Sequence, residues 1–237
     1  MDDDRQGRRI MTRHARRSAR MLALMCIAAP SLAAARIAPD PFSPQGFRQP
    51  GARELARCPS LGWIDYRALA GVATKEVGRL DAPLDAQHAA LRGPYAMPHP
   101  ADADVMITTV IGPGETQETP TSTSSAIWRD GDGRWWFDRV DRRPGDERIH
   151  SSGRLAADLA QAVDRALADP CFALEPDYLP IMPPARPDHA AQYGYSFILS
   201  VVRIEHAGKV RAMLQGLMTD GYRAIGDAVT YARAGSL

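Results

Sequence analysis

Residues 124–141 read SSAIWR-DGDG-RWWFDRVD, and this stretch decides how the rest of the chain is arranged. A doubled Asp-Gly between two β-forming runs is a strong signal for a tight hairpin turn. We therefore predict antiparallel strands over 124–130 and 134–141. The doubled Asp-Gly also resembles the start of a calcium loop. That interpretation is disfavoured because Arg134 takes the place of an oxygen ligand and no glutamate closes the loop.

An amphipathic helix is predicted directly after the hairpin, over residues 154–168. Its apolar residues recur at helical spacing, and they are Leu155, Leu159, Val163 and Leu167. Ser151 or Ser152 is placed to cap the first turn, and Pro170 prevents the helix from continuing. The next residue, Cys171, is placed to anchor the end of this helix.

Residues 1–35 have the order of a secretory signal. Seven arginines lie between residues 5 and 20, the apolar run 21–29 follows, and Ala33-Ala34-Ala35 offers small residues for cleavage. The run is far shorter than the ~20 residues that span a membrane. We expect export to the periplasm or the medium, with no stable membrane span after cleavage. A retained membrane anchor is the alternative.

The charge of the chain argues against two classes of partner. The full chain has a net charge of +1, and removal of residues 1–35 takes away seven arginines and three aspartates, which leaves −3. A nucleic-acid-binding protein would show a basic footprint instead, so we expect no nucleic acid partner. The balance also gives no reason to expect adsorption to anionic lipid.

Cysteine usage predicts one disulfide bond. The chain has three cysteines, and Cys26 lies in the segment that we expect to be removed. The other two, Cys58 and Cys171, most simply form a disulfide in an exported protein. A pair of reduced thiols or a metal site is the alternative, although neither cysteine belongs to a Cys-x-x-Cys pair.

Two proline-rich segments divide the exported chain. Residues 36–60 hold five prolines and are predicted to be a flexible leader without a helix. Residues 61–237 are expected to form a single domain. Within it, residues 176–187 hold another five prolines and predict an extended strap over the surface. The strap could also present an edge to a partner.

The expected fold of this domain is α+β: an antiparallel sheet of about five strands with helices packed mainly on one face. Besides the two hairpin strands, apolar and β-branched composition predicts strands over 104–111, 195–205 and 209–217. The predicted strand over 195–205 has apolar residues on both of its faces, which favours a central position in the sheet. Besides the helix over 154–168, further helices are expected over 63–80, over 83–91 and after a cap at Thr219 or Asp220.

No catalytic constellation stands out in the sequence. No serine lies in a Gly-x-Ser-x-Gly motif, and no two histidines have the i, i+4 spacing of a helical metal site. Asp138 and Asp141 lie beside aromatic residues, as carboxylates of sugar-binding clefts often do. Arginines adjoin both, so surface ion pairs are the favoured interpretation. We therefore predict no catalytic residue, no metal and no cofactor.

The best candidate site is the tryptophan cluster of the hairpin. Aromatic residues make up only 7% of the chain, yet three of its four tryptophans lie in this stretch. Neighbouring strand residues face opposite ways, so Trp135 and Trp136 cannot both point into one core. The uncovered ring would form an aromatic platform for a ligand or partner, and a second covering helix would make it core. The candidate residues are Trp128, Trp135, Trp136, Arg129, Arg134 and Arg139.

The sequence favours a non-catalytic exported protein of the cell envelope that binds a protein partner or a small ligand. The expected signal, the expected disulfide and the lack of a convincing catalytic motif support this class. A small periplasmic hydrolase with dispersed aspartate and histidine residues is the alternative. Asp138, Asp141 and a histidine gathered in one pocket would favour the hydrolase.

Overall fold

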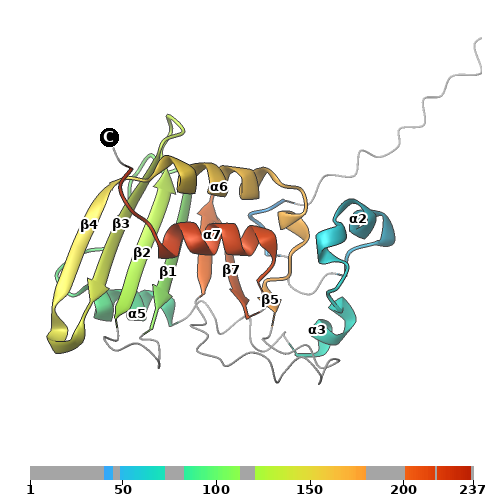
Figure 1. The fold of residues 1–237 in the computed structure, drawn as a ribbon, viewed down its shortest axis with the longest axis horizontal. Coiled ribbons are helices and arrows are strands. Elements are labelled where there is room, and N and C mark those ends of the chain that lie inside the picture. The colour runs from blue at the N-terminus through green and yellow to red at the C-terminus, as the bar shows by residue number, and fades with distance from the viewer. Residues whose placement is uncertain are drawn as a thin grey trace, which may run out of the picture. The chain divides into compact units, whose positions relative to one another are not determined.

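Seven strands form one sheet in the order β4-β3-β2-β1-β6-β7-β5, as Figure 1 shows. The computed structural model describes residues 40–44, 49–72, 83–112, 121–179, 201–216 and 218–235. Neighbouring strands are antiparallel except β5 and β7, which are parallel. The strands are β1 (Val105–Ile111), β2 (Ser122–Arg129), β3 (Trp135–Arg142), β4 (Arg148–Arg154), β5 (Tyr178–Leu179), β6 (Val202–His206) and β7 (Lys209–Gln215).

The α+β class is confirmed, but the prediction of about five antiparallel strands is wrong in number and in direction. The missed strands are β4 and β5. Arg-Ile-His-Ser-Ser-Gly-Arg of β4 has few β-forming residues, and β5 has only two residues. Their strand conformation depends on ladders to β3 and β7, which sequence composition does not show.

The predicted hairpin is confirmed. Strand β2 pairs with β3 in a register that sets Ile127 opposite Phe137. The turn closes where the amide of Asp130 donates to the carbonyl of Arg134 over 3.0 Å. Gly133 adopts φ +79°, a conformation that glycine reaches without steric cost, so the second Asp-Gly pair supplies the turn geometry.

The predicted helix after the hairpin exists but begins later than expected. Helix α6 spans Ala157–Ala168, and its N-cap is Ala156. Ser151 and Ser152 belong to β4 and therefore do not cap the helix, which corrects that prediction. The chain after β3 turns through the 3-10 helix Pro144–Asp146 and returns as a further strand before α6 starts.

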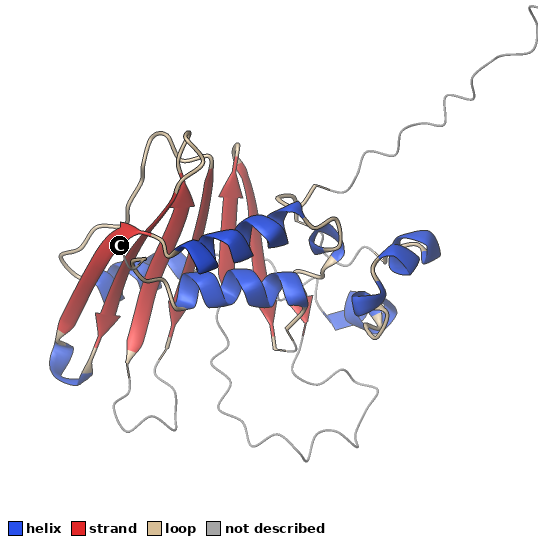
Figure 2. Ribbon diagram, turned by 45° about the horizontal axis from the view of Figure 1, so that its top comes forward, coloured by secondary structure: helices blue, strands red, loops and turns tan. Residues whose placement is uncertain are grey.

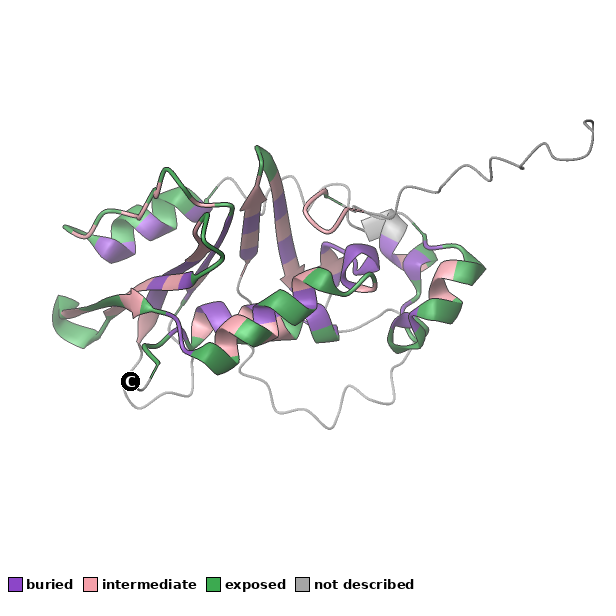
Figure 3. Ribbon diagram, turned by 90° about the horizontal axis from the view of Figure 1, so that it is seen from above, coloured by how far each residue is buried: buried purple, intermediate pink, exposed green. Residues whose placement is uncertain are grey.

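Helices cover both faces of the sheet. Figure 3 shows α6 and α7 (Asp220–Thr230) on one face and α5 (Leu84–Arg92) on the other. The helices predicted over 83–91 and after Thr219 are confirmed as α5 and α7, and Thr219 is the N-cap of α7. The prediction of helices mainly on one face therefore describes α6 and α7 and omits α5.

The main core lies between the sheet and the helix pair α6 and α7, which cross the same face in Figure 2. Every second residue along the strands points towards these helices and supplies one side of this core. The other side comes from the apolar stripes of the two helices, which have the 3.6-residue period of amphipathic helices. Central members are Ile107, Ile127, Phe137, Ile204, Val163, Ile225 and Val229, each at most 2% exposed.

A buried carboxylate holds the start of α7. Glu175 follows the 3-10 helix Phe172–Leu174 and is 2% exposed. Its two carboxylate oxygens accept hydrogen bonds from the amides of Gly221 and Tyr222 over 2.8 and 2.9 Å. These amides have no partner inside the helix, so a carboxylate that binds them stabilises the helix end. Burial nevertheless raises the pKa of Glu175.

A small second core contains the disulfide. Helix α2 (Ala52–Arg57), the 3-10 helix Pro59–Leu61 and helix α3 (Tyr66–Val72) pack beside β5. Cys58 and Cys171 are bonded, with their Cα atoms 5.5 Å apart, as the cysteine pattern predicted. The prediction that residues 36–60 hold no helix is wrong at α2, because Glu54 caps that helix by accepting from the amide of Gly51.

Several predictions fall on residues that the structure does not describe. They are the signal over 1–35, the part of the helix over 63–80 beyond Val72, the strap beyond Leu179 and the strand 195–205 before Val201. The described residues all belong to one unit, Pro39–Leu237. In the described part of the chain, no helix has the length and apolarity that a membrane span requires.

Candidate functional site

The sheet separates the six candidate residues instead of gathering them. Side chains alternate along a strand, and directly opposite residues share a face. Trp135, Arg129 and Arg139 therefore lie on the face covered by α6 and α7, which we call the α6 face. Trp128 and Trp136 stand opposite each other on the other face, the α5 face. Arg134 lies in the turn.

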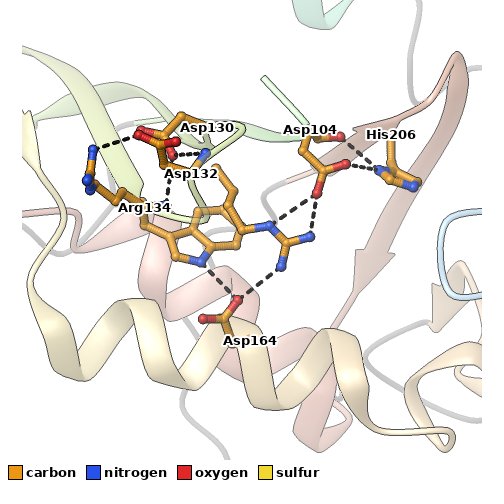
Figure 4. A network of polar contacts seen from close by, with 8 residues as sticks. Asp104, Asp130, Asp132, Arg134, Asp164 and His206 are labelled. Carbon is orange, nitrogen blue, oxygen red and sulfur yellow. Dashed lines mark hydrogen bonds and ion pairs between the residues drawn. The ribbon is translucent and has the colours of Figure 1, made fainter. Parts of the chain in front are cut away.

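Trp135 belongs to the core. It is 3% exposed, and its indole Nε1 donates to Asp164 Oδ1 on α6 over 3.0 Å. The guanidinium of Arg129 lies 5.7 Å from the Trp135 ring centre and pairs with Asp164 and Asp104. Figure 4 labels Asp164, Asp104 and His206 in this network. The other carboxylate oxygen of Asp104 lies 3.2 Å from His206 Nδ1. This network joins α6 to the strands.

A surface cavity of about 710 Å³ adjoins this network and is lined by Asp104, Arg129, Asp130, Gly131, Gly133, Asp164 and Ala168. Its three carboxylates already accept hydrogen bonds from arginine, indole or backbone donors. None of the described buried polar atoms without a partner lines it. Across the described residues, no three acidic, histidine or cysteine side chains are placed to hold a metal ion. The cavity therefore gives no indication of a ligand.

The remaining two arginines of the predicted site make local contacts. Arg139 binds Asp141 and donates to the carbonyl of Thr230 at the end of α7 over 2.7 Å. Arg134 pairs with Asp132 at 2.8 Å within the exposed turn. Neither arginine flanks the tryptophans of the α5 face, so the predicted six-residue platform is not assembled as one surface.

Trp128 and Trp136, which we call the tryptophan pair, are partly exposed on the α5 face. The Nε1 of Trp136 donates to Asp130 Oδ2 over 2.8 Å. Asp130 Oδ1 in turn accepts from the amides of Asp132 and Arg134 over 3.0 and 2.8 Å. The Trp136 bond, followed by these amides, lowers the pKa of Asp130. The hairpin turn thus fixes the orientation of one indole of the pair.

A polar cluster continues the same face towards α5. Asp138 forms an ion pair with Arg92 of α5 and a hydrogen bond with Nε2 of His150 on β4, the latter at 2.7 Å. Arg92 is 1% exposed and also donates to the carbonyls of Tyr95 and Ala96, each over 3.1 Å. The rings of Tyr95 and His150 lie 4.6 Å apart. These contacts hold His150, whose side chain is 31% exposed, in one orientation.

A serine and a histidine meet beneath α5. His88 Nδ1 lies 2.7 Å from Ser124 Oγ, and Arg92 lies 3.3 Å from the same hydroxyl. Burial, then the charge of Arg92, lowers the pKa of His88 to about 4. Ser124 is fully buried, and Nε2 of His88 has no partner in the described part of the chain. A buried hydroxyl without a carboxylate-oriented base is not an accessible nucleophile.

Sequence reasoning did not single out His88, Arg92 or Ser124. A signal for two of them existed. His88 and Arg92 share the buried face of α5 with Leu84 and Leu91, so two polar residues interrupt an apolar stripe. Such residues need partners when they are buried, but the sequence does not show that Ser124 and Asp138 provide them.

Asp138 and Asp141 do not form a carboxylate pair. Asp141 lies on the α6 face, where it accepts from Thr123 over 2.6 Å and pairs with Arg139. Asp138 lies on the α5 face with His150. The two aspartates and the histidine that would favour a hydrolase therefore do not share one pocket. The contact between Asp138 and His150 remains.

The comparisons with known proteins give no further direction. No family model matches the chain, and searches of curated proteins and of solved structures also found no match. The residues of the α5 face therefore carry the proposed binding site.

Proposed function

We propose that the chain is an exported protein of the cell envelope that binds a saccharide on the tryptophan pair without chemical conversion. Export is supported by the order of basic, apolar and small residues in 1–35 and is compatible with the Cys58–Cys171 disulfide. The observation behind the binding site is the partly exposed Trp136 ring, which stands across from Trp128 and is fixed by Asp130.

A fixed indole suits ring stacking. Tryptophan offers a large contact area, and a side chain that is already held in place loses little conformational entropy when it binds. Two partly exposed rings cover much less than the roughly 800 Å² per partner of a standard protein interface. The large hydrophobic residues that are most exposed lie elsewhere, at Trp63 and Tyr231. The pair therefore fits a small ligand better than a protein.

The two neighbouring tryptophans provide a matched test. We expect Trp136→Ala to abolish saccharide binding with a smaller loss of stability than Trp135→Ala, because Trp136 is partly exposed. Trp135→Ala removes a core ring and should lower the free energy of unfolding by about 3–5 kcal/mol. Urea denaturation gives the stability, and quenching of tryptophan fluorescence by a panel of oligosaccharides gives the binding. Equal, large stability losses for both variants would show that the pair is core and contradict the proposal.

Hydrolysis is the second candidate function, because Asp138 orients His150 in the manner of a catalytic base. In that case the wild-type chain would cleave an acylated or glycosidic substrate, and His150→Gln would abolish turnover while the tryptophan pair still bound the product. Under the binding proposal, wild type and His150→Gln show the same absence of turnover. Product analysis by mass spectrometry distinguishes the two functions.

A further inference from the structure

Arg154 stands apart from the other arginines of the sheet. Six other arginines lie on described strands, and each pairs with a carboxylate: Arg129, Arg139, Arg142, Arg148, Arg203 and Arg211. Arg154, the last residue of β4, is exposed and forms no ion pair or hydrogen bond with the described residues. No described residue therefore occupies its guanidinium, which an external group could bind.

The position of Arg154 links this free charge to the tryptophan pair. Arg154 is the direct cross-strand neighbour of Trp136, which is in turn the neighbour of Trp128. Directly opposite residues share a face, with Cβ atoms about 5 Å apart. The three residues thus form a row across the open edge of the sheet, with the cation at its outer end.

The carboxylates near this row are already engaged. Asp138 is bonded by Arg92 and His150, and Asp130 accepts from Trp136 and two backbone amides. No acidic residue lies on β4 itself. The row therefore combines two aromatic rings with a positive charge that no described carboxylate pairs with, which complements a ring-shaped ligand with an anionic group.

We propose that the ligand is a saccharide with a carboxylate, such as a uronic acid, whose ring stacks on the tryptophan pair while Arg154 binds its carboxylate. This inference rests on the proposed function and adds the chemical class of the ligand. The planar guanidinium matches a carboxylate in two parallel hydrogen bonds, which a neutral sugar cannot accept in the same way.

The experiment compares trigalacturonic acid with its methyl ester, which keeps the rings and removes the charge. The full-length chain with its disulfide formed is titrated with each at low salt in a calorimeter. We expect the acid to bind roughly tenfold more tightly than the ester, as one charge-assisted contact predicts. Arg154→Gln should make the two affinities equal. Arg165→Gln, which removes an exposed arginine of α6, should keep the preference.

The outcomes distinguish failure of the carboxylate inference from failure of saccharide binding. Equal binding of acid and ester by the wild type overturns the carboxylate inference and leaves saccharide binding in place. A preference that survives Arg154→Gln overturns the role of Arg154. Absence of binding by either sugar overturns the carboxylate inference, and the oligosaccharide panel then tests saccharide binding separately. A preference that Arg154→Gln removes and Arg165→Gln keeps supports both.

Discussion

At the scale of single residues, His88 couples the stability of the protein to pH. Its pKa is about 4 in the folded chain, first because of burial and then because of Arg92, whereas a free histidine has a pKa near 6.5. The folded state therefore favours the neutral ring. The stabilising contribution is complete above about pH 6.5 and is lost progressively as the pH falls towards 4.

The lowered pKa of His88 predicts a measurable dependence of the unfolding free energy on pH. Between about pH 7 and pH 5, the wild type should lose about 2 kcal/mol more unfolding free energy than His88→Asn, which has no ring to protonate. Urea denaturation at the two pH values measures the difference. Carboxylates that titrate in the same range affect both proteins alike, so they cancel. Parallel pH profiles for the two proteins would show that His88 does not carry the effect.

At the scale of elements, the contact between α5 and the sheet depends on Asp138. Arg92 is 1% exposed, and Asp138 is its carboxylate partner. Asp138→Asn should therefore lower the free energy of unfolding by about 3–5 kcal/mol, because it leaves a buried charge without compensation. Hydrogen exchange should show that α5 loses protection before α6 and α7 do.

The exposed Arg134–Asp132 pair is the control for this prediction. Asp132→Asn should leave the stability almost unchanged, since ion pairs in solvent contribute little. Adding Arg92→Met to Asp138→Asn should recover part of the loss, because the buried charge is then removed as well. If the double variant is no more stable than Asp138→Asn, the loss of unfolding free energy comes from disrupted packing of α5 and not from the unpaired charge of Arg92.

At the scale of the whole molecule, the disulfide joins the segment with α2 and α3 to the end of α6. It closes a separation of 113 residues, for which the chain-entropy model gives about 4–5 kcal/mol. We expect the variant Cys58→Ser/Cys171→Ser to lose about that much unfolding free energy. Limited proteolysis should then cut first between α2 and α3, because the second core is small.

The main core provides the control for the disulfide. Trp135 lies under α6, far along the sheet from β5, so its fluorescence should stay native in the double serine variant. A variant as stable as the wild type would show that the second core holds this segment without the bond. Loss of the native Trp135 signal would show that the two cores unfold together.

Local sequence determined the parts of this protein that depend on neighbours in the chain. The hairpin follows from Asp-Gly between β-forming runs, α6 and α7 follow from helical apolar spacing, and the cysteine pairing follows from elimination. The opposite facing of Trp135 and Trp136 follows from the two-residue period of a strand. Each of these features is set by geometry within a few residues or by the lack of alternatives.

Only the tertiary structure decided which tryptophan is covered and which polar groups meet. His88 and Arg92 reach Ser124 and Asp138 because α5 lies on the face opposite α6, and no local rule places a helix on one face of a sheet. Strand β4 exists because β3 offers it a hydrogen-bonding edge, and that ladder brings Arg154 beside Trp136. The site that we propose is therefore a product of pairing between segments, which sequence periodicity does not encode.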